Sequence, residues 1–132
     1  MTPSSMFPHA GQEQVAVYGT LKKGFSNHAL LADSPLVDED WILGLSLYDL
    51  GPFPAAKRSH SPQPVFVEVY AVTAATLRRL DELEDYYPDS PQTSLYVRKR
   101  MQVEGSSSCW VYIYNRSVAH HPLIEDGIWL GR

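Results

Sequence analysis

The alternation of apolar and polar residues predicts one clear helix, over residues 73–85. At about 100° per residue, its apolar arc consists of Leu77, Leu80 and Leu83. Glu84 falls inside this arc, between Leu77 and Leu80, whereas Asp81 lies just outside it. One carboxylate is therefore predicted to face the core at the end of the helix, where the helix dipole disfavours negative charge.

Burial without a paired cation would raise the pKa of Glu84 and make it a better base, as proton-transfer catalysis requires. Two structural alternatives stay open at this point. Glu84 belongs to a frayed last turn and bends back to water, or it pairs with a buried arginine such as Arg98 or Arg100. Structural ion pairs also perturb pKa values, so the position in the helix does not assign a role by itself.

Apolar runs and period-two alternation predict short strands around this helix. Their ranges are 14–18, 41–48, 65–72, 95–103 and 109–114, and the last two form a hairpin through 104–108. A short helix is predicted over 25–31, with Ser26 or Asn27 as its cap. The connection over 49–64 is rich in Pro and Gly, as is typical of segments that line binding sites, and a second loop covers 86–94. This pattern predicts an α+β fold, with the sheet curled into a barrel.

Alternation in the last predicted strand separates its side chains onto two faces. One face carries Trp110, Tyr112 and Tyr114, and the other carries Cys109, Val111 and Ile113. Such an aromatic stripe is usually core packing, although an exposed stripe would serve as a surface for a protein partner.

Length and charge narrow the possible functions. The 132 residues suit a single domain over 14–132, preceded by a flexible lead-in over 1–13. A net charge of −4 argues against a general binder of nucleic acid or of an anionic membrane. We expect a cytoplasmic protein, because the single cysteine excludes an internal disulfide and the sequence shows neither a leader nor a bilayer-spanning run.

The end of the first strand is a candidate binding loop. Gly19 and Thr20 follow that strand, and backbone N–H groups at such a mouth are open to a ligand. Gly19 and Gly24 have the spacing of a phosphate-binding loop, but Phe25 stands where that motif requires lysine. An ordinary strand-exit turn remains the alternative for Gly19-Thr20.

Other chemistry-bearing residues give weaker signals. The five histidines lack the spacing of a metal site, so no metal is expected. Cys109 lies within a strand and is interpreted as a packed small residue. Tyr96 and Arg98 face the same side of their strand, where they either hold a ligand carboxylate or form a cross-strand pair.

Six segments, in this order along the chain, resemble motifs of the γ-glutamylcyclotransferase-like family, in particular its AIG2-like branch. They are Val17-Tyr-Gly-Thr-Leu-Lys-Lys-Gly24, Leu47-Tyr-Asp-Leu-Gly-Pro-Phe-Pro-Ala55, Glu68-Val-Tyr70, Leu80-Asp-Glu-Leu-Glu84, Tyr96-Val-Arg98 and Ile124-Glu-Asp-Gly-Ile-Trp129. The Tyr-Gly-Thr-Leu turn followed by Leu-Asp-x-Leu-Glu and Tyr-x-Arg is specific in combination. The resemblance covers nearly the whole chain from Gln14.

The resemblance implies a mixed barrel with flanking helices and a cavity between them. The segment Tyr18, Gly19, Thr20 and Leu21 would hold the α-amino-acid end of a γ-glutamyl group. The family's general base falls on Glu84, the residue that the helical pattern also selects. Val67 stands where the family often has glycine, and this departure is expected to narrow the cavity or to change the curvature of the sheet.

The function implied is cyclisation of a small γ-glutamyl amine or peptide to 5-oxoproline, with release of the free amine. The substrate's own α-amine attacks the γ-carbonyl, so neither water nor a cofactor takes part. Tyr96 and Arg98 are further candidate substrate-binding residues. Two alternatives remain open, a catalytically silent binding module for an amino-acid-like ligand and a protein-interaction domain that uses the aromatic stripe.

Overall fold

The computed structural model describes residues 12–60, 64–103 and 108–131. The strands are β1 Gln12–Val17, β2 Leu36–Ile42, β3 Leu45–Asp49, β4 Pro54–Arg58, β5 Val65–Thr73, β6 Tyr96–Gln102 and β7 Ser108–Tyr114. The helical elements are α1 Ala74–Leu83 and the 3₁₀ turns η2 His28–Leu31 and η3 Pro91–Thr93. Residues 1–11 of the predicted lead-in lie outside the described residues, and Gln12 and Glu13 already pair with Thr73 and Val72.

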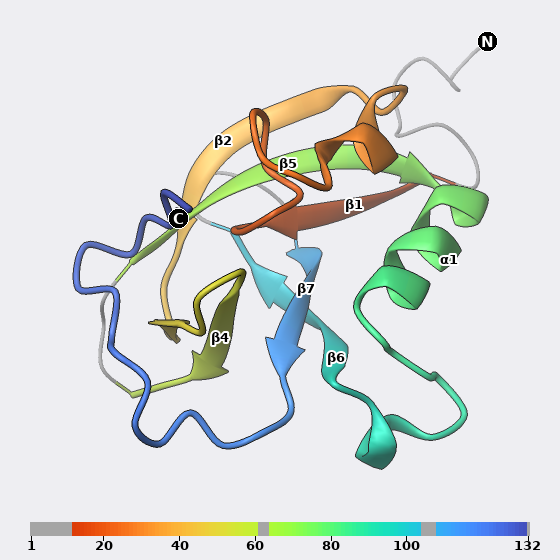
Figure 1. The fold of residues 1–132 in the computed structure, drawn as a ribbon. Helices are drawn as coiled ribbons and strands as arrows, with labels where there is room; N and C mark the ends of the chain where they lie inside the picture. The colour runs from red at the N-terminus through yellow and green to blue at the C-terminus, as the bar shows by residue number, and fades with distance from the viewer. Residues whose placement is uncertain (1–11, 61–63, 104–107, 132) are drawn as a thin grey trace, which may run out of the picture.

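A five-stranded mixed sheet forms the frame, in the order β2-β5-β1-β7-β6 (Figure 1). All neighbours are antiparallel except β1 and β7, which run parallel with Val15 opposite Trp110. The hairpin of β3 and β4 forms a sheet of its own. The α+β class is therefore confirmed, whereas the predicted barrel is not. In the described residues the large sheet ends at β2 and β6, and one α-helix is present where several flanking helices were expected.

Two hydrophobic clusters pack around the large sheet. The first contains Val65, Val67, Val69, Cys109 and Val111, and the second contains Val15, Tyr70, Leu77, Leu80 and Tyr112. The alternation in β7 thus places Cys109 and Val111 against one cluster and Tyr112 against the other, as predicted. Trp110 and Tyr114 also pack against the second cluster, so the aromatic stripe is core packing.

The first half of the chain differs from the prediction at two places. The predicted strand 41–48 is two strands, because Gly44 adopts a φ of +92° and turns the chain between β2 and β3. The predicted connection 49–64 contains β4, whose backbone pairs with β3 from Pro54 to Arg58. The four prolines of this segment masked its strand character. The predicted hairpin of β6 and β7 is confirmed, although residues 104–107 of its turn lie outside the described residues.

Helix α1 runs down one side of the sheet from the end of β5 (Figure 1). Its N-cap is Thr73, whose hydroxyl accepts a hydrogen bond from the N–H of Thr76. The buried residues are Leu77, Leu80 and Asp81, whereas Leu83 is 38% exposed. The predicted arc was therefore misplaced by one row. The buried face of α1 is centred near Leu77 and Glu84 and includes Asp81. Asp81 is buried because Arg98 of β6 and Tyr112 of β7 supply it with polar partners.

The short segment after β1 is only a 3₁₀ turn. Asn27 precedes η2, but its side chain does not cap the turn. The amide of Asn27 instead donates to the hydroxyl of Thr20 at 2.9 Å, so the predicted capping role is wrong. Among the described residues, no helix is long and apolar enough to cross a membrane.

Candidate active site

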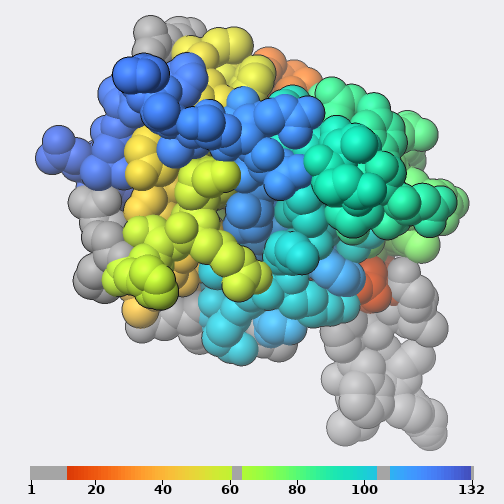
Figure 2. Space-filling view, turned by 90° about the horizontal axis from the view of Figure 1, so that it is seen from below, coloured from red at the N-terminus to blue at the C-terminus, as the bar shows by residue number. Residues whose placement is uncertain are grey.

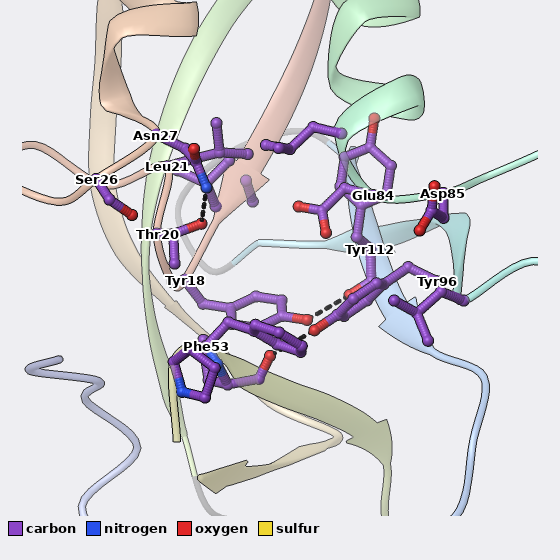
Figure 3. Close-up of a pocket in the computed structure, with 17 residues that line it drawn as sticks. Tyr18, Thr20, Leu21, Ser26, Asn27, Phe53, Glu84, Asp85, Tyr96 and Tyr112 are labelled. Atoms are coloured by element: carbon purple, nitrogen blue, oxygen red, sulfur yellow. Dashed lines mark hydrogen bonds between the residues drawn. The ribbon is translucent and has the colours of Figure 1, made fainter. Parts of the chain in front are cut away.

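A cavity of about 400 Å³ lies between the loop after β1 and the C-terminal end of α1 (Figure 3). Its lining comes from 16–21, 26–27, 52–54 and 83–85, with Leu95, Tyr96 and Tyr112 completing the wall. The Pro- and Gly-rich connection, which was predicted to line a binding site, contributes Pro52, Phe53 and Pro54 to the lining of this cavity. Segments far apart in sequence thus meet around one cavity of a size that suits a small metabolite.

The carboxylate of Glu84 lies in the middle of the cavity wall (Figure 3). In the described part of the chain it forms neither a hydrogen bond nor an ion pair, because Arg98 binds Asp81 and Arg100 binds Glu13. The proposed pairing of Glu84 with an arginine is therefore wrong. Burial, with a smaller contribution from the neighbouring charge of Asp85, raises the pKa of Glu84 to about 8.

Asp81 fixes the end of α1 one turn before Glu84. Arg98 binds it with two hydrogen bonds, from Nε to Oδ1 at 2.8 Å and from a terminal nitrogen to Oδ2 at 3.1 Å. The hydroxyl of Tyr112 also donates to Oδ1, at 2.6 Å. Two strands therefore hold the helix at its last turn, which determines where Glu84 stands. The helical pattern placed Asp81 outside the buried arc and gave no sign of this network.

Tyr96 and Arg98 have different surroundings although they lie on the same strand. Tyr96 lines the cavity, and its hydroxyl donates to the carbonyl of Pro54 at 2.8 Å. Arg98 does not line the cavity. Its guanidinium binds Asp81 and lies 4.3 Å from the ring centroid of Trp110. Arg98 thus forms an internal pair, but its partner lies on α1 and not on a neighbouring strand, so the predicted cross-strand pair is wrong.

Tyr18 joins the small sheet to the large one beneath the cavity. Its hydroxyl donates to the carbonyl of Tyr112 at 2.6 Å and accepts from the N–H of Ala56 at 3.3 Å. Burial, followed by the nearby charge of Glu84, raises the pKa of Tyr18 well above its usual value. The phenol therefore stays protonated and keeps its donor role.

The loop from Gly19 to Leu21 forms the wall opposite Glu84. The carbonyl of Thr20 accepts from the N–H of Asn27 at 2.9 Å, which holds the loop in a turn. Within the described residues, the N–H groups of Thr20 and Leu21 donate to no acceptor. Buried N–H groups in proteins are nearly always paired, so two unpaired donors beside a cavity are a suitable site for an anionic oxygen.

Gly19 is required for a reason other than access for a ligand. A Cβ atom at Gly19 would lie 2.7 Å from Cγ and 2.8 Å from Cδ of Pro54. The loop after β1 and the first residue of β4 therefore touch, and only glycine allows this contact.

Lys22 ties the same loop to the last part of the chain. It is only 3% exposed, and its Nζ donates to the carbonyl of Trp129 at 2.8 Å. The rings of Phe25 and Phe66 flank the ammonium at 5.2 and 5.5 Å. Burial lowers the pKa of Lys22, and the charge of Glu68 opposes this shift. A buried cation thus anchors the loop that follows β1.

Val67 does not affect the cavity in the way expected. It is fully buried in the first hydrophobic cluster and does not line the cavity. The expected narrowing of the cavity by Val67 is therefore wrong.

Sequence reasoning also missed Ser26, Asn27, Phe53 and Asp85 as lining residues. Phe53 stood within a recognised motif, and Asp85 stood directly beside Glu84. The described residues contain no group of three or more His, Cys, Asp or Glu that is placed to hold a metal ion.

Comparison with known proteins agrees with this geometry. A family model described as gamma-glutamyl cyclotransferase, AIG2-like, matches residues 15–131. The chain belongs to this family. The resemblance of its sequence motifs is thereby confirmed, and the cavity described above is the candidate active site of a γ-glutamyl cyclotransferase-family protein.

Named relatives support the assignment along most of the chain. A Vibrio cholerae protein provisionally named a gamma-glutamylcyclotransferase is 37% identical over 126 residues, which cover 92% of this chain and 98% of the relative. The gamma-L-glutamyl-butirosin B gamma-glutamyl cyclotransferase of Niallia circulans is 36% identical over 104 residues, which cover 76% of this chain and 65% of the relative.

Solved structures share the fold. The solution structure of Escherichia coli ytfP has a TM-score of 0.68 at 34% identity and covers 89% of this chain and 96% of its own. An uncharacterised Pyrococcus horikoshii protein has a TM-score of 0.71 at 26% identity, with 88% of each chain covered. The mixed α+β architecture is thus that of the family.

Proposed function

We propose that this protein cyclises a γ-glutamyl amine or peptide to 5-oxoproline and releases the free amine. The observation that carries the proposal is Glu84, a carboxylate that lines the cavity without a partner among the described residues and has a pKa raised to about 8. A base poised near neutral pH is what removal of a proton from an ammonium group requires. Membership of the family supports the same reaction.

The proposed reaction uses only the substrate's own atoms. The α-ammonium gives a proton to Glu84, and the resulting amine attacks the γ-carbonyl carbon. The new C–N bond closes a five-membered lactam, the original amide C–N bond breaks, and the proton returns to the leaving nitrogen. Because nucleophile and electrophile belong to one molecule, the main task of the protein is to hold the glutamyl chain folded for attack.

The walls of the cavity suggest how the glutamyl group is held. The unpaired N–H groups of Thr20 and Leu21 lie in the wall opposite Glu84 and would bind either the α-carboxylate or the developing oxyanion. Tyr18 and Tyr96 also line the cavity, but their hydroxyls are already bound to backbone carbonyls. We therefore assign them to shaping the cavity. Arg98 acts in this proposal through Asp81, by positioning α1.

The decisive experiment measures release of 5-oxoproline from a panel of γ-glutamyl amines and peptides. Wild type is compared with Glu84→Gln, which keeps the shape of the side chain, and with Glu82→Gln as a matched control. Glu82 is exposed on the same helix and does not line the cavity. We expect loss of turnover in Glu84→Gln alone, by at least about 10³-fold. Retained turnover in folded Glu84→Gln would refute the assignment of the base.

The same panel separates the enzyme from a silent binding module. If wild type binds γ-glutamyl compounds but releases no 5-oxoproline from any of them, the catalytic proposal fails and the binding module remains. A cytoplasmic setting is part of the proposal, because a chain with one cysteine, Cys109, cannot form an internal disulfide and suits a reducing compartment.

A further inference from the structure

The charged side chains that line the cavity are all negative. Among the seventeen described residues that line it, Glu84 and Asp85 carry carboxylates, and none is lysine, arginine or histidine. Arg98, the cation bound near the end of α1, is held by Asp81 and lies outside the lining. The described wall therefore offers no countercharge to a negatively charged part of a substrate, beyond the backbone N–H groups of the loop after β1.

The two acids lie on one side of the cavity, and the polar loop residues lie on the other. Thr20, Ser26 and Asn27 lie across the space from Glu84 in Figure 3, and Asp85 lies on the outer side of Glu84. Both carboxylates line the cavity and that of Asp85 is exposed, so an amine expelled beside Glu84 toward solvent would leave near a second negative charge. The exposed side chain of Leu83 also lines the cavity, and it would contact the methylene groups of such an amine.

Asp85 has no structural role that explains its charge. It adopts a left-handed φ of +53° directly after the C-cap of α1, a position that glycine or asparagine normally occupies. The negative charge also lies against the C-terminal end of the helix dipole. The side chain is exposed and forms no ion pair with a described residue; its hydrogen bond, from the hydroxyl of Tyr87, is long at 3.5 Å.

Resting on the proposed function, we propose that the site selects γ-glutamyl amides whose leaving amine carries a second positive charge, and that Asp85 is the specificity-determining residue. A distal ammonium group would lie against Asp85 as the amine leaves. A distal carboxylate would meet the same charge with repulsion and find no cationic side chain in the described wall. The favoured substrate class is the γ-glutamyl amide of a diamine or polyamine, rather than a γ-glutamyl peptide with a free carboxylate.

The test uses three amides that differ only in their distal group. They are the γ-glutamyl amides of 1,4-diaminobutane, pentylamine and 5-aminopentanoate, each with four methylene groups before an ammonium, a methyl or a carboxylate. We expect kcat/KM for 5-oxoproline release to favour the ammonium over the carboxylate by at least about tenfold at low salt. The preference should shrink as ionic strength rises, because the side chain of Asp85 is exposed to solvent.

Two variants connect this preference with Asp85. Asp85→Asn removes the charge and suits the left-handed backbone, and Glu82→Gln removes a charge from the same end of α1 outside the cavity. We expect Asp85→Asn to reduce the ammonium-to-carboxylate ratio by about fivefold or more. Glu82→Gln should leave the ratio unchanged. Because each ratio compares substrates on one variant, changes in the ionisation of Glu84 cancel.

The outcomes distinguish failure of the selectivity from failure of the function. If none of the three amides yields 5-oxoproline, the proposed function fails. If all three react at similar rates, or if Asp85→Asn leaves the ratio unchanged, cyclisation stands and the role of Asp85 is overturned. A ratio on wild type that does not respond to salt would also overturn it.

Discussion

At the scale of single residues, Glu84 combines burial with the lack of a partner, and both features raise the free energy of its ionised form. The carboxylate stands in the buried arc of α1, beside the negative charge of Asp85 and at the unfavourable end of the helix dipole. Stability alone would favour an uncharged residue at this position. The site thus holds a base that binds a proton more tightly than a carboxylate in water does.

The first prediction concerns the pH dependence of turnover. Glu84 must be ionised to accept the proton of the substrate ammonium, and its pKa is raised to about 8. We expect kcat/KM to rise with pH through about 8, so that the rate falls about tenfold for each unit below that value. A rate profile on the pentylamine amide from pH 5 to 9 checks this. A profile that is flat between pH 5 and 8 would contradict the raised pKa.

The second prediction concerns the same ionisation and the stability of the fold. In the unfolded chain Glu84 loses its proton near the ordinary value of 4.5, but the folded protein retains it up to about 8. Relative to Glu84→Gln, the stability of wild type is therefore full below pH 4.5 and is lost as pH rises through 8. Because Glu84 is partly exposed, we expect a relative loss on the order of 3 kcal/mol.

Urea unfolding of wild type and Glu84→Gln at pH 5 and pH 8 measures this loss directly. Glu82→Gln serves as the control, because its exposed carboxylate should change stability little at either pH. An equal difference between wild type and Glu84→Gln at both pH values would show that Glu84 titrates normally.

Residue patterns were sufficient to find Glu84 but not its surroundings. A helical period of 3.6 residues places a side chain on a face, so the outlying carboxylate in an apolar arc was visible in the sequence. The partners of Asp81 were not visible. Arg98 and Tyr112 reach it from strands that are 17 and 31 residues away in sequence, and no local period records such a contact.

At the scale of elements, three strands and one helix are joined through aromatic hydroxyls. Tyr18 links β4 to β7, Tyr96 links β6 to β4, and Tyr112 links β7 to α1. Each hydroxyl is buried and bonded, so each bond is geometrically specific as well as stabilising. The cavity lies among these bonds and is expected to keep its shape when empty.

The third prediction tests the link between α1 and the sheet. Asp81→Asn leaves the guanidinium of Arg98 buried without its anion, and its side chain is only 15% exposed. We expect a loss of about 3 kcal/mol in the free energy of unfolding. Tyr112→Phe removes one hydrogen bond and should cost about 1 kcal/mol.

The double variant should lose less than the sum of both changes, since the two groups share one oxygen of Asp81. Urea denaturation of wild type, both single variants and the double variant measures this coupling. Strict additivity would show that the two interactions act independently.

The order of the elements was largely predictable, and the sheet arrangement was not. Apolar runs and period-two alternation identified β1, β5, β6 and β7, because apolar residues recur along each of these strands. The strand β4 was missed, since Pro54 opens it and its sequence is short and rich in alanine. Strand pairing depends on contacts between distant segments, so a curled open sheet and a closed barrel produce the same local patterns.

At the scale of the whole molecule, the last described residues pack against the loop that follows β1. Trp129 is 5% exposed and contacts Phe25 with ring centroids 5.3 Å apart. The N–H of Phe66 donates to the carbonyl of Gly127 at 2.9 Å, which joins the same segment to β5. The blue segment that follows β7 in Figure 1 therefore belongs to the support of the site. The space-filling view from below shows part of it lying across the lower face beside β7 (Figure 2).

The fourth prediction tests this support. Lys22→Met removes the ammonium that donates to the carbonyl of Trp129 but keeps a long apolar side chain. We expect loss of about 1–3 kcal/mol of stability, because a buried acceptor loses its partner. Hydrogen exchange should accelerate in 119–131. The matched control is Lys23→Met, since Lys23 is exposed and only its backbone N–H is bonded, to Glu68. Equal exchange in both variants would contradict the role of Lys22.

The contact between Gly19 and Pro54 also limits how the site can evolve. A larger residue at position 19 collides with the proline ring, and a change at Pro54 alone leaves empty the space that the glycine leaves for it. Useful variants at these positions are therefore reached by paired changes, through single intermediates of lower fitness. Libraries built one substitution at a time would report this wall of the cavity as immutable, whereas libraries that randomise both positions together would recover new shapes.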